Sequence, residues 1–383
     1  MKILFCGRPS YGHLYPLMPL AIAFREQDAE VSFATGPDFV PRLEALGFPA
    51  HPVGRSILWA EEEAIRQNPA LANLAQQDKP ILGMTMFSEM LPPATVEDLL
   101  PLISTTKPEM IIYEGADFGA PLAAALSGIP AVFHSYGAPW PPFMVDLMTP
   151  KLQELWSSYG VTTPPADTMH GDIYLDISPP GLGDASGHGF PHRLPLRPVP
   201  FAEPLGELPG WVSEARDRPL AYVTLGTVVF ERIDVLKAAV DGLAQLEVDV
   251  LVALGPNGDP DALGVLPRRV RAQLFVPQDR LLPFVDVIVH HCGSGTMLGG
   301  LANGIPQLAV PQGADQFYNG ASLARAGAGI ALMPHEITPD AVAAGVKKLL
   351  EEPSFEQAAQ GIQAEIEGML SPEEVARRLS EIL

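Results

Sequence analysis

Two series of short apolar runs, each alternating with helix-like segments, constrain the fold of this 383-residue chain more than any other feature. The first series includes KILFCG, VSFAT, MIIYE and AVFH within residues 2–134, and the second extends from LAYVTL to GIALMP within residues 220–334. Apolar runs of that length, separated by helical segments, are typical of βαβ units around a buried parallel sheet. The sequence therefore predicts an α/β chain with two doubly wound sheets.

A stretch rich in proline and glycine separates the two series. Residues 177–210, ISPPGLGDASGHGFPHRLPLRPVPFAEPLGELPG, can sustain neither a helix nor a central strand. Because a single hydrophobic core stops growing beyond roughly 250 residues, we expect two domains. We place one Rossmann-like domain at residues 1–205 and the other at 206–370. Residues 371–383 carry a serine cap and apolar residues at helical spacing, and we expect a helix there that packs back on the first domain.

Charge and cysteine content exclude several classes of function. The chain has 24 Lys and Arg against 45 Asp and Glu, a formal charge of −21. That charge repels nucleic acids and anionic membranes, so we expect no nucleic-acid partner and no stable membrane association. The two cysteines argue against a disulfide scaffold, and no stretch reaches the roughly 18 apolar residues of a membrane helix. We expect a soluble, cytoplasmic protein, and the sequence leaves open whether it forms a homodimer.

The stretch VIVHHCGSGTMLGG, residues 287–300, carries the strongest local signal for a ligand site. An apolar strand is followed by the turn Gly293-Ser294-Gly295 and by a helix that starts near Thr296. The free N–H groups and the dipole of such a helix attract a diphosphate, and they do so without a nearby lysine or arginine. Ligands of doubly wound sheets bind at the carboxyl ends of the strands, where this turn is expected to lie.

Other interpretations of the same stretch are weaker. A zinc site formed by His290, His291 and Cys292 is disfavoured because adjacent strand residues point to opposite faces. A dinucleotide fingerprint needs its third glycine one residue before Gly299, and the turn follows the fourth strand of its half and not the first. Asp315 nevertheless lies at the spacing of a ribose-binding acid, so an NAD(P)-dependent oxidoreductase remains an alternative.

Residues 275–332, from FVPQDR to AGAGIAL, resemble the donor-binding signature of the family 1 GT-B glycosyltransferases, most closely the bacterial enzymes that glycosylate natural products such as antibiotics. The N-terminal GRPSYGHLYPLMPLA resembles the opening loop of the same family, and the resemblance is weakest at 55–105 and 140–205. It implies two facing Rossmann-like domains with an interdomain cleft. It also implies an enzyme that moves a sugar from a nucleotide diphosphate donor to an acceptor hydroxyl.

The resemblance places the donor site in the second domain. Phe275 matches an aromatic residue that stacks on the nucleotide base, and His291 matches the histidine that donates to the diphosphate. Asp315 and Gln316 match the pair that holds the sugar hydroxyls. The remaining donor-binding candidates are Gly226, Thr227, Val276, Gln278, Gly293, Ser294, Gly295 and Thr296.

One departure from the family pattern bears on the donor. Gly299 stands where many UDP-sugar enzymes of the family have a glutamate that binds the ribose hydroxyls. A deoxyribose donor does not need that contact, so we favour a dTDP-sugar over a UDP-sugar.

The resemblance places catalysis in the first domain. His13 matches the general base, which takes the proton of the acceptor hydroxyl as its oxygen attacks the anomeric carbon and inverts the configuration. A carboxylate that fixes the tautomer of such a histidine is expected at Glu114, and Asp117 is the alternative as partner or as helix cap. We expect no metal and no other cofactor, because the glycine turn and His291 would stabilise the leaving diphosphate.

Two apolar segments broken by proline, residues 81–93 and 134–148, are expected beside strand ends in the N-terminal half. Such methionine-rich segments are more often ordinary core, but they also suit an adaptable pocket for a small, largely apolar acceptor. The acceptor-binding candidates are Met84, Met86, Trp140, Phe143 and Met144. A catalytically silent nucleotide-sugar-binding protein is the other alternative, although it would need neither the histidine nor the glutamate of the first domain.

Overall fold

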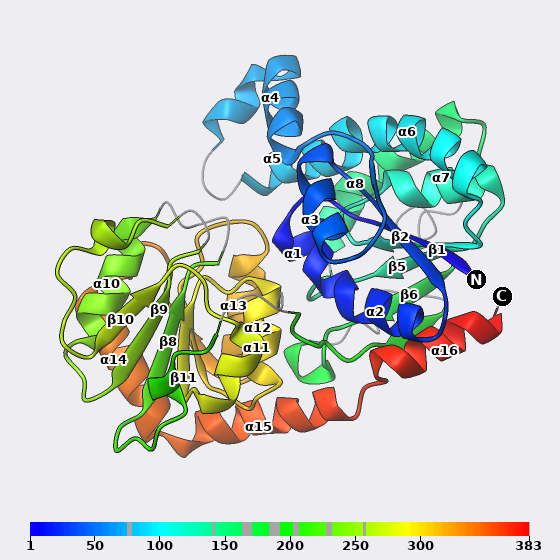
Figure 1. The fold of residues 1–383 in the computed structure, drawn as a ribbon. Coiled ribbons are helices and arrows are strands. Elements are labelled where there is room, and N and C mark those ends of the chain that lie inside the picture. Colours follow the sequence, from blue (N-terminus) through cyan, green and yellow to red (C-terminus); the bar gives the residue numbers. More distant parts are fainter. Residues whose placement is uncertain are drawn as a thin grey trace. The chain divides into compact units, whose positions relative to one another are not determined.

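The computed structural model describes residues 1–74, 79–139, 142–162, 171–183, 192–201, 207–226, 232–255 and 258–382. Thr227 and Trp140, two of the candidates named above, lie outside these ranges. The chain divides into two compact units, drawn in Figure 1. The first unit comprises Met1–Ile177, Ala185–Arg197 and Leu370–Leu383, and the second comprises Ser178–Asp184 and Pro198–Met369. The domain boundary after residue 205 stays a prediction.

The first unit contains a seven-stranded parallel sheet with the strand order β3-β2-β1-β4-β5-β6-β7. Its strands are β1 (Lys2–Cys6), β2 (Glu30–Thr35), β3 (Ala50–Pro52), β4 (Met110–Glu114), β5 (Ala131–His134), β6 (Ile173–Asp176) and β7 (Arg193–Pro195). The order reverses between β1 and β4, where the loops after the two strands diverge. Brändén-type sheets bind their ligands at this switch point. β7, which comes from the proline-rich stretch, is an edge strand, as expected where proline removes ladder donors.

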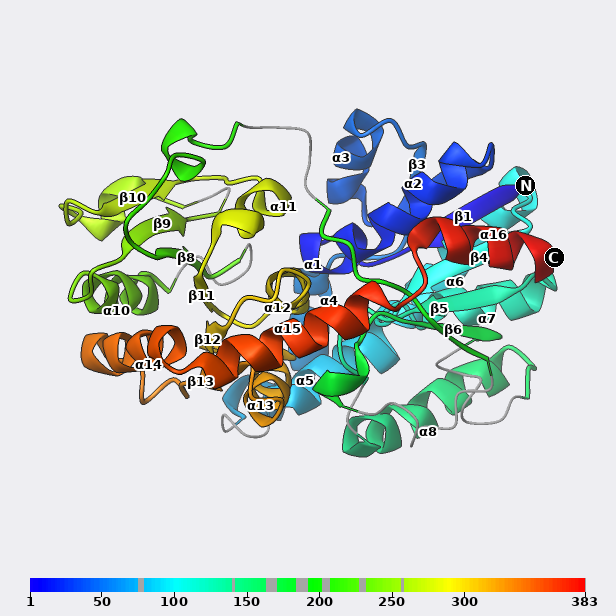
Figure 2. The same cartoon turned by 90° about the horizontal axis from the view of Figure 1, so that it is seen from below.

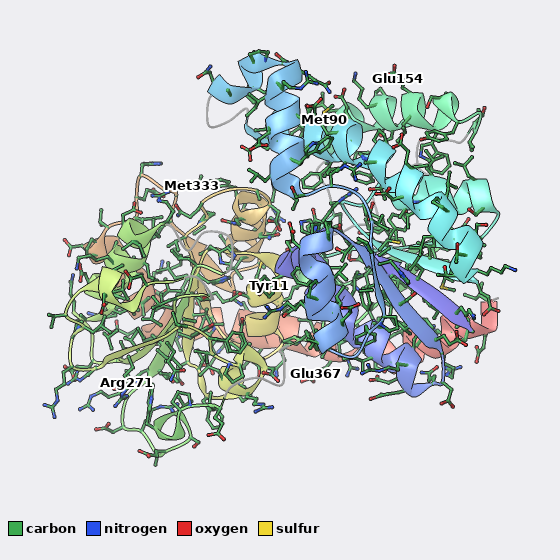
Figure 3. All side chains as sticks on the ribbon, turned by 45° about the horizontal axis from the view of Figure 1, so that its top comes forward. Tyr11, Met90, Glu154, Arg271, Met333 and Glu367 are labelled. Carbon is green, nitrogen blue, oxygen red and sulfur yellow. The ribbon has the colours of Figure 1, made fainter. Side chains whose placement is uncertain are left out.

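Helices cover this sheet and carry several of the candidate residues. They are α1 (Tyr11–Leu14), α2 (Met18–Glu26), α3 (Val40–Ala45), α4 (Ile57–Gln67), α5 (Lys79–Thr85), α6 (Leu91–Thr106), α7 (Gly119–Ser127), α8 (Pro142–Ser158) and α16 (Pro372–Ile382). A π-helical segment, η5 (Met86–Met90), joins α5 to α6, and its last residue is labelled in Figure 3. α16 runs beside α2, where Gln27 donates to the carbonyl of Glu373 at 3.0 Å (Figure 2).

The second unit contains a six-stranded parallel sheet with the order β10-β9-β8-β11-β12-β13. Its strands are β8 (Leu220–Thr224), β9 (Asp249–Ala253), β10 (Val270–Gln273), β11 (Val287–His290), β12 (Gln307–Ala309) and β13 (Gly329–Ala331). Its helices are α10 (Ile233–Leu243), α11 (Gln278–Leu281), α12 (Ser294–Leu301), α13 (Gln316–Arg325), α14 (Pro339–Glu351) and α15 (Pro353–Glu367). The order reverses between β8 and β11, which places the histidine-glycine turn at the second switch point.

The two predicted sheets are confirmed, and several strands end before the apolar runs that predicted them. The second series also contains the apolar run AQLFV, residues 272–276, which predicts a strand over those residues, but β10 ends at Gln273. Leu274 and Phe275 follow it, and each is 45% exposed. The apolar character that suggested a strand there belongs to a surface loop. The short 3₁₀ segments are η1 (Tyr15–Leu17), η2 (Pro37–Phe39), η3 (Pro69–Asn73), η6 (Pro180–Leu182), η8 (Gly210–Val212), η9 (Pro260–Leu263) and η10 (Leu282–Phe284).

Candidate active site

The structure brings His13 and Glu114 together at the switch point of the first sheet. β1 and β4 are hydrogen-bonded neighbours with Cys6 opposite Tyr113, so the loop after β1 meets the end of β4. His13 Nδ1 lies 2.9 Å from Glu114 Oε2; the Glu114 side chain is fully buried and that of His13 is 17% exposed. Gly7 permits this approach, because a Cβ at that position would come within 3.0 Å of Glu114 Cγ.

Glu114 is held as a buried carboxylate. Burial alone raises its pKa, but the adjacent His13, the hydrogen bond to it, the Ala116 N–H and the charge of Arg8 together bring the pKa below its ordinary value. The Ala116 N–H donates to Oε2 at 2.8 Å, and the Arg8 backbone N–H donates to Oε1 at 3.1 Å. An ionised Glu114 accepts the hydrogen of Nδ1, which makes Nε2 the basic nitrogen of His13.

Asp117 has a different partner from the one considered in the sequence. Its Oδ1 accepts from Arg8 Nη2 at 2.9 Å, and both side chains are buried. Burial raises the pKa of Asp117, while the Arg8 cation acts in the opposite direction. Of the two acids at the end of β4, Glu114 is therefore the one that contacts the imidazole, and Asp117 forms an ion pair with the loop that follows β1.

Two aromatic side chains beside His13 were not singled out from the sequence. The Phe87 ring centroid lies 6.2 Å and the Tyr136 ring centroid 5.1 Å from the imidazole. Phe87 belongs to the π-helical segment η5, and such segments are frequent at functional sites because the extra residue redirects side chains. The available sequence signal for Phe87 was its place in the apolar segment 81–93, of which only the methionines were predicted to contact the acceptor.

The acceptor candidates fall into two groups. Met84 and Met86 are buried in two separate apolar clusters, the first with Phe118, Met148 and Leu152 and the second around Ala60 and Leu91. By contrast, Phe143 on α8 is 45% exposed and Met144 is half-buried. Of these four candidates only Phe143 is exposed, whereas Met144 packs against the cluster that contains Met84, and Phe87 packs against the clusters of both buried methionines.

In the second unit, His291 lies between the backbones of two glycines. A Cβ added at Gly226 or at Gly293 would overlap the imidazole, so only glycine at both positions leaves room for the ring. Burial lowers the pKa of His291 to about 4, and the nearby Thr224 backbone acts in the opposite direction. Nδ1 is buried and has no hydrogen-bond partner among the described residues. A neutral imidazole in this position can donate one hydrogen bond to an anionic ligand.

The glycine turn continues directly into α12. Gly293 is the N-cap residue of α12, with φ −64° and ψ 142°. The N-terminus of the helix therefore has no side-chain cap. Gly295 is exposed and a Cβ there would meet nothing within 4 Å, and Thr296 is half-buried. The first N–H groups of a helix have no acceptor within it, so this end presents donors to an anion.

The pair Asp315-Gln316 has a fixed hydrogen-bond polarity. Gln316 Oε1 accepts from the N–H groups of Gln312, at 2.8 Å, and Gly313, at 3.1 Å, which leaves the amide nitrogen as the donor for a ligand. Asp315 Oδ2 accepts from Ser294 Oγ at 3.0 Å. The pair therefore offers one carboxylate oxygen as acceptor and one amide group as donor.

Asn319 was missed in the sequence and supports both loops of this site. Its Nδ2 lies 2.8 Å from Asp315 Oδ2, 3.0 Å from the Cys292 carbonyl oxygen and 3.1 Å from Ser294 Oγ. Cys292 and Ala314 both have positive φ, 67° and 52°, which costs on the order of 1–3 kcal/mol per non-glycine residue. The i,i+4 spacing of an amide after Asp315 on a helix was the available signal.

The base-binding candidates lie at the start of α11. Phe275 is exposed, whereas Val276 is buried and offers only its backbone to a ligand. Gln278 Nε2 is buried without a hydrogen-bond partner among the described residues. A Cβ at Gly299 would lie 3.7 Å from that nitrogen, 3.1 Å from Leu282 Cδ1 and 3.5 Å from Pro200 Cγ.

Neither a metal-binding cluster nor a membrane-spanning helix is found among the described residues. Within the described ranges, the structure contains no group of three or more His, Cys, Asp or Glu side chains placed to hold a metal ion. His290 accepts from the Cys292 N–H at Nδ1, 3.1 Å away, and burial lowers its pKa to about 3. None of the described helices combines the length and apolar character needed to cross a membrane.

Two parallel α/β units, a buried His–Glu pair at one switch point and a glycine turn before a helix at the other define a glycosyltransferase of the GT-B fold. The N-terminal domain of the erythromycin biosynthesis protein CIII-like family matches residues 22–226, and its C-terminal domain matches residues 237–382. The chain belongs to this family.

Individual relatives agree with this assignment over the whole chain. The aclacinomycin-T 2-deoxy-L-fucose transferase of Streptomyces galilaeus is 28% identical over 434 residues and covers 100% of this chain and 96% of its own. The elloramycin glycosyltransferase ElmGT of Streptomyces olivaceus is 30% identical over 399 residues, 99% of this chain and 97% of its own. The crystal structure of the glycosyltransferase VinC in complex with dTDP matches with a TM-score of 0.81 and 28% identity, covering 100% of this chain and 99% of that one.

Proposed function

We propose that this glycosyltransferase transfers a sugar from a dTDP-sugar to a hydroxyl of a small, largely apolar natural product, with inversion at the anomeric carbon. The contact between His13 Nδ1 and Glu114 Oε2, at 2.9 Å, is the observation that carries the proposal. An imidazole whose Nδ1 hydrogen is held by a buried carboxylate has the tautomer and the charge partner of a general base. A protein that only bound nucleotide sugars would not need this arrangement.

In the proposed reaction, His13 Nε2 accepts the proton of the acceptor hydroxyl while the oxygen attacks the anomeric carbon. The imidazolium that forms lies against the ionised Glu114, so the product of proton transfer is stabilised by a charge already in place. A single displacement of this kind inverts the configuration. Phe87 and Tyr136 flank the imidazole and provide apolar surface on which an aglycone can pack.

On the donor side, we assign the diphosphate to the start of α12 and to His291. Both supply hydrogen bonds where negative charge develops as the sugar leaves, which is the task that a divalent cation performs in other transferases. His291 acts as a neutral donor because burial keeps its pKa near 4. Asp315 and Gln316 hold the sugar, and Phe275 stacks on the base.

The preference for a deoxyribose donor is supported by the surroundings of Gly299. The glycine has no carboxylate to bind a ribose diol, and Leu282 and Pro200 lie where its side chain would extend. A 2′-hydroxyl placed against these apolar atoms would lose hydration, and the Gln278 amide nitrogen, 3.7 Å from a Cβ at Gly299, is a single donor where a carboxylate would accept from both ribose hydroxyls. The relative VinC was crystallised with dTDP.

Isothermal titration calorimetry with dTDP, dUDP, UDP and NAD tests the donor assignment. dUDP and UDP differ only in the 2′-hydroxyl, and we expect dUDP to bind about fivefold more tightly, equivalent to roughly 1 kcal/mol. We expect dTDP to bind at least as tightly as dUDP and NAD to give no saturable heat. Tighter binding of UDP than of dUDP would overturn the deoxyribose preference, and binding of NAD alone would overturn the donor site as a whole.

A further inference from the structure

Arg8 is a buried cation whose side-chain hydrogen bonds reach two separate segments of the first unit, α6 and the loop after β4. Only 2% of the Arg8 surface is exposed. Nη1 donates to Thr95 Oγ1 on α6 at 3.0 Å, and Nε donates to the carbonyl oxygen of Ala116 at 3.2 Å. Nη2 donates to Asp117 Oδ1 at 2.9 Å. A guanidinium is suited to such a position because its donors point in fixed, different directions.

These contacts join the two loops that carry the proposed base and its carboxylate. Arg8 lies between β1 and α1, five residues before His13, and Ala116 and Asp117 follow Glu114 after a single glycine. The backbone of Arg8 also donates to Glu114 Oε1 at 3.1 Å. One residue thus fixes the glutamate through its backbone and the loop behind the glutamate through its side chain.

The ion pair also determines the local charge. Glu114 and Asp117 are both fully or almost fully buried, and Arg8 is the cation that contacts this pair among the described residues. One positive and two negative charges leave a net charge of −1 beside His13. A proton arriving on His13 during the reaction would bring the buried cluster to neutrality.

We propose that Arg8 is a positioning residue for the His13–Glu114 pair: it holds the loop after β4 against the loop after β1 and neutralises Asp117, so that a single negative charge acts on the base. The inference rests on the proposed function of His13. Arg8 acts through Glu114 and Asp117 and is not itself assigned a contact with substrate.

Other titratable groups near the cluster leave this balance unchanged. Burial lowers the pKa of His134, opposite Glu114 on β5, to about 4, so its side chain is neutral at the pH of an assay. Burial raises the pKa values of Cys6 and Tyr113 well above their ordinary values, which keeps both uncharged. The Tyr136 phenol packs beside His13 from the loop after β5.

The test compares the pH dependence of kcat/KM in Asp117→Asn and in the double variant Arg8→Met/Asp117→Asn. The acidic limb of this profile reports the protonation of the free enzyme's base. Asp117→Asn changes the net charge of the cluster from −1 to 0, so we expect the limb to move to lower pH by about one unit. The double variant restores −1, so we expect its limb to return to the wild-type position while kcat stays at least about tenfold lower.

Further variants separate positioning from stability. Arg8→Lys keeps the charge but not the fork of donors, so we expect a wild-type limb with an intermediate kcat. Asp176→Asn is the matched control: it removes a buried carboxylate, paired with Arg193 at 2.7 Å, on β6, two strands from β4. We expect this control to leave the limb unmoved, and thermal unfolding of each variant shows whether it is folded at the assay temperature.

Three outcomes would overturn the inference. They are an unmoved limb in Asp117→Asn, a double variant that stays shifted or keeps full kcat, and an equal shift in Asp176→Asn. Failure of the proposed function is recognised separately, because His13→Ala would then retain transfer. If His13→Ala is inactive and the limb of Asp117→Asn does not move, the base assignment stands and the role of Arg8 falls.

Discussion

Replacing His13 by alanine is expected to lower kcat for sugar transfer by about 10³-fold while the dissociation constant for dTDP stays unchanged. The variant loses the nitrogen that we propose takes the acceptor proton, whereas the proposed nucleotide site belongs to the other unit. Transfer is measured by chromatography, with the aglycone that the wild-type enzyme glycosylates best in a panel of aromatic and macrolide aglycones. Binding of dTDP is measured by calorimetry.

A matched control and a coupled variant sharpen this experiment. His192→Ala removes an exposed histidine of the same unit and should leave kcat unchanged. Glu114→Gln should lower kcat substantially, yet His13→Ala/Glu114→Gln should be no slower than His13→Ala, because the carboxylate acts through the imidazole. Retention of more than about a tenth of wild-type kcat in His13→Ala would place the base elsewhere.

The second large effect is expected for His291→Ala, with a loss of about 10²-fold in kcat/KM and weaker binding of dTDP. The variant removes the neutral donor that we propose for the diphosphate, both in the bound donor and as charge develops on the leaving group. Steady-state kinetics in the dTDP-sugar and calorimetry with dTDP separate the two contributions. Unchanged affinity together with unchanged kcat/KM would remove His291 from the donor site.

Gly293→Ala offers an independent route to the same result. The backbone at Gly293 has a negative φ that alanine tolerates, but the added Cβ would overlap the His291 ring. We expect its loss of dTDP affinity to approach that of His291→Ala. Gly361→Ala on α15 is the control, since a Cβ there meets nothing within 4 Å and alanine favours a helix.

The sequence was most informative where local pattern determines structure. MIIYE and AVFH are β4 and β5, residue for residue, because a buried parallel strand needs a continuous apolar run. The positions of His13 and Glu114 near the ends of β1 and β4 followed from the resemblance together with that strand pattern. Parallel neighbours then bring their carboxyl ends to the same edge, as the register of β1 and β4 shows.

The residues that sequence reasoning missed depend on contacts between distant segments. Arg8 donates to Thr95, which lies 87 positions further along the chain. No local sequence pattern around a single loop arginine predicts such a distant partner. Phe87 lies beside His13 from a π-helical segment, whose register no 3.6-residue periodicity predicts. Asn319 matters because two strained loops meet at its amide, a property of the folded chain alone.

At Gly299, the sequence and the structure each contribute to the predicted donor preference. The sequence indicated that a ribose-binding carboxylate is missing, and this alone weakened the case for a UDP-sugar. The structure adds that Leu282 and Pro200 lie in the direction of the missing side chain. Apolar carbons are thus the nearest neighbours of this position and the Gln278 amide nitrogen lies 3.7 Å away, so no carboxylate replaces the missing glutamate there.

The configuration of the product at the anomeric carbon tests the central claim most directly. With dTDP-α-D-glucose as donor and the best aglycone of the panel as acceptor, a single displacement assisted by His13 must give a β-glucoside. The coupling constant between the protons H1 and H2 of the transferred glucose distinguishes the two anomers in the nuclear magnetic resonance spectrum of the purified product. A β-linked product is the predicted result, and an α-linked product would contradict the proposed mechanism.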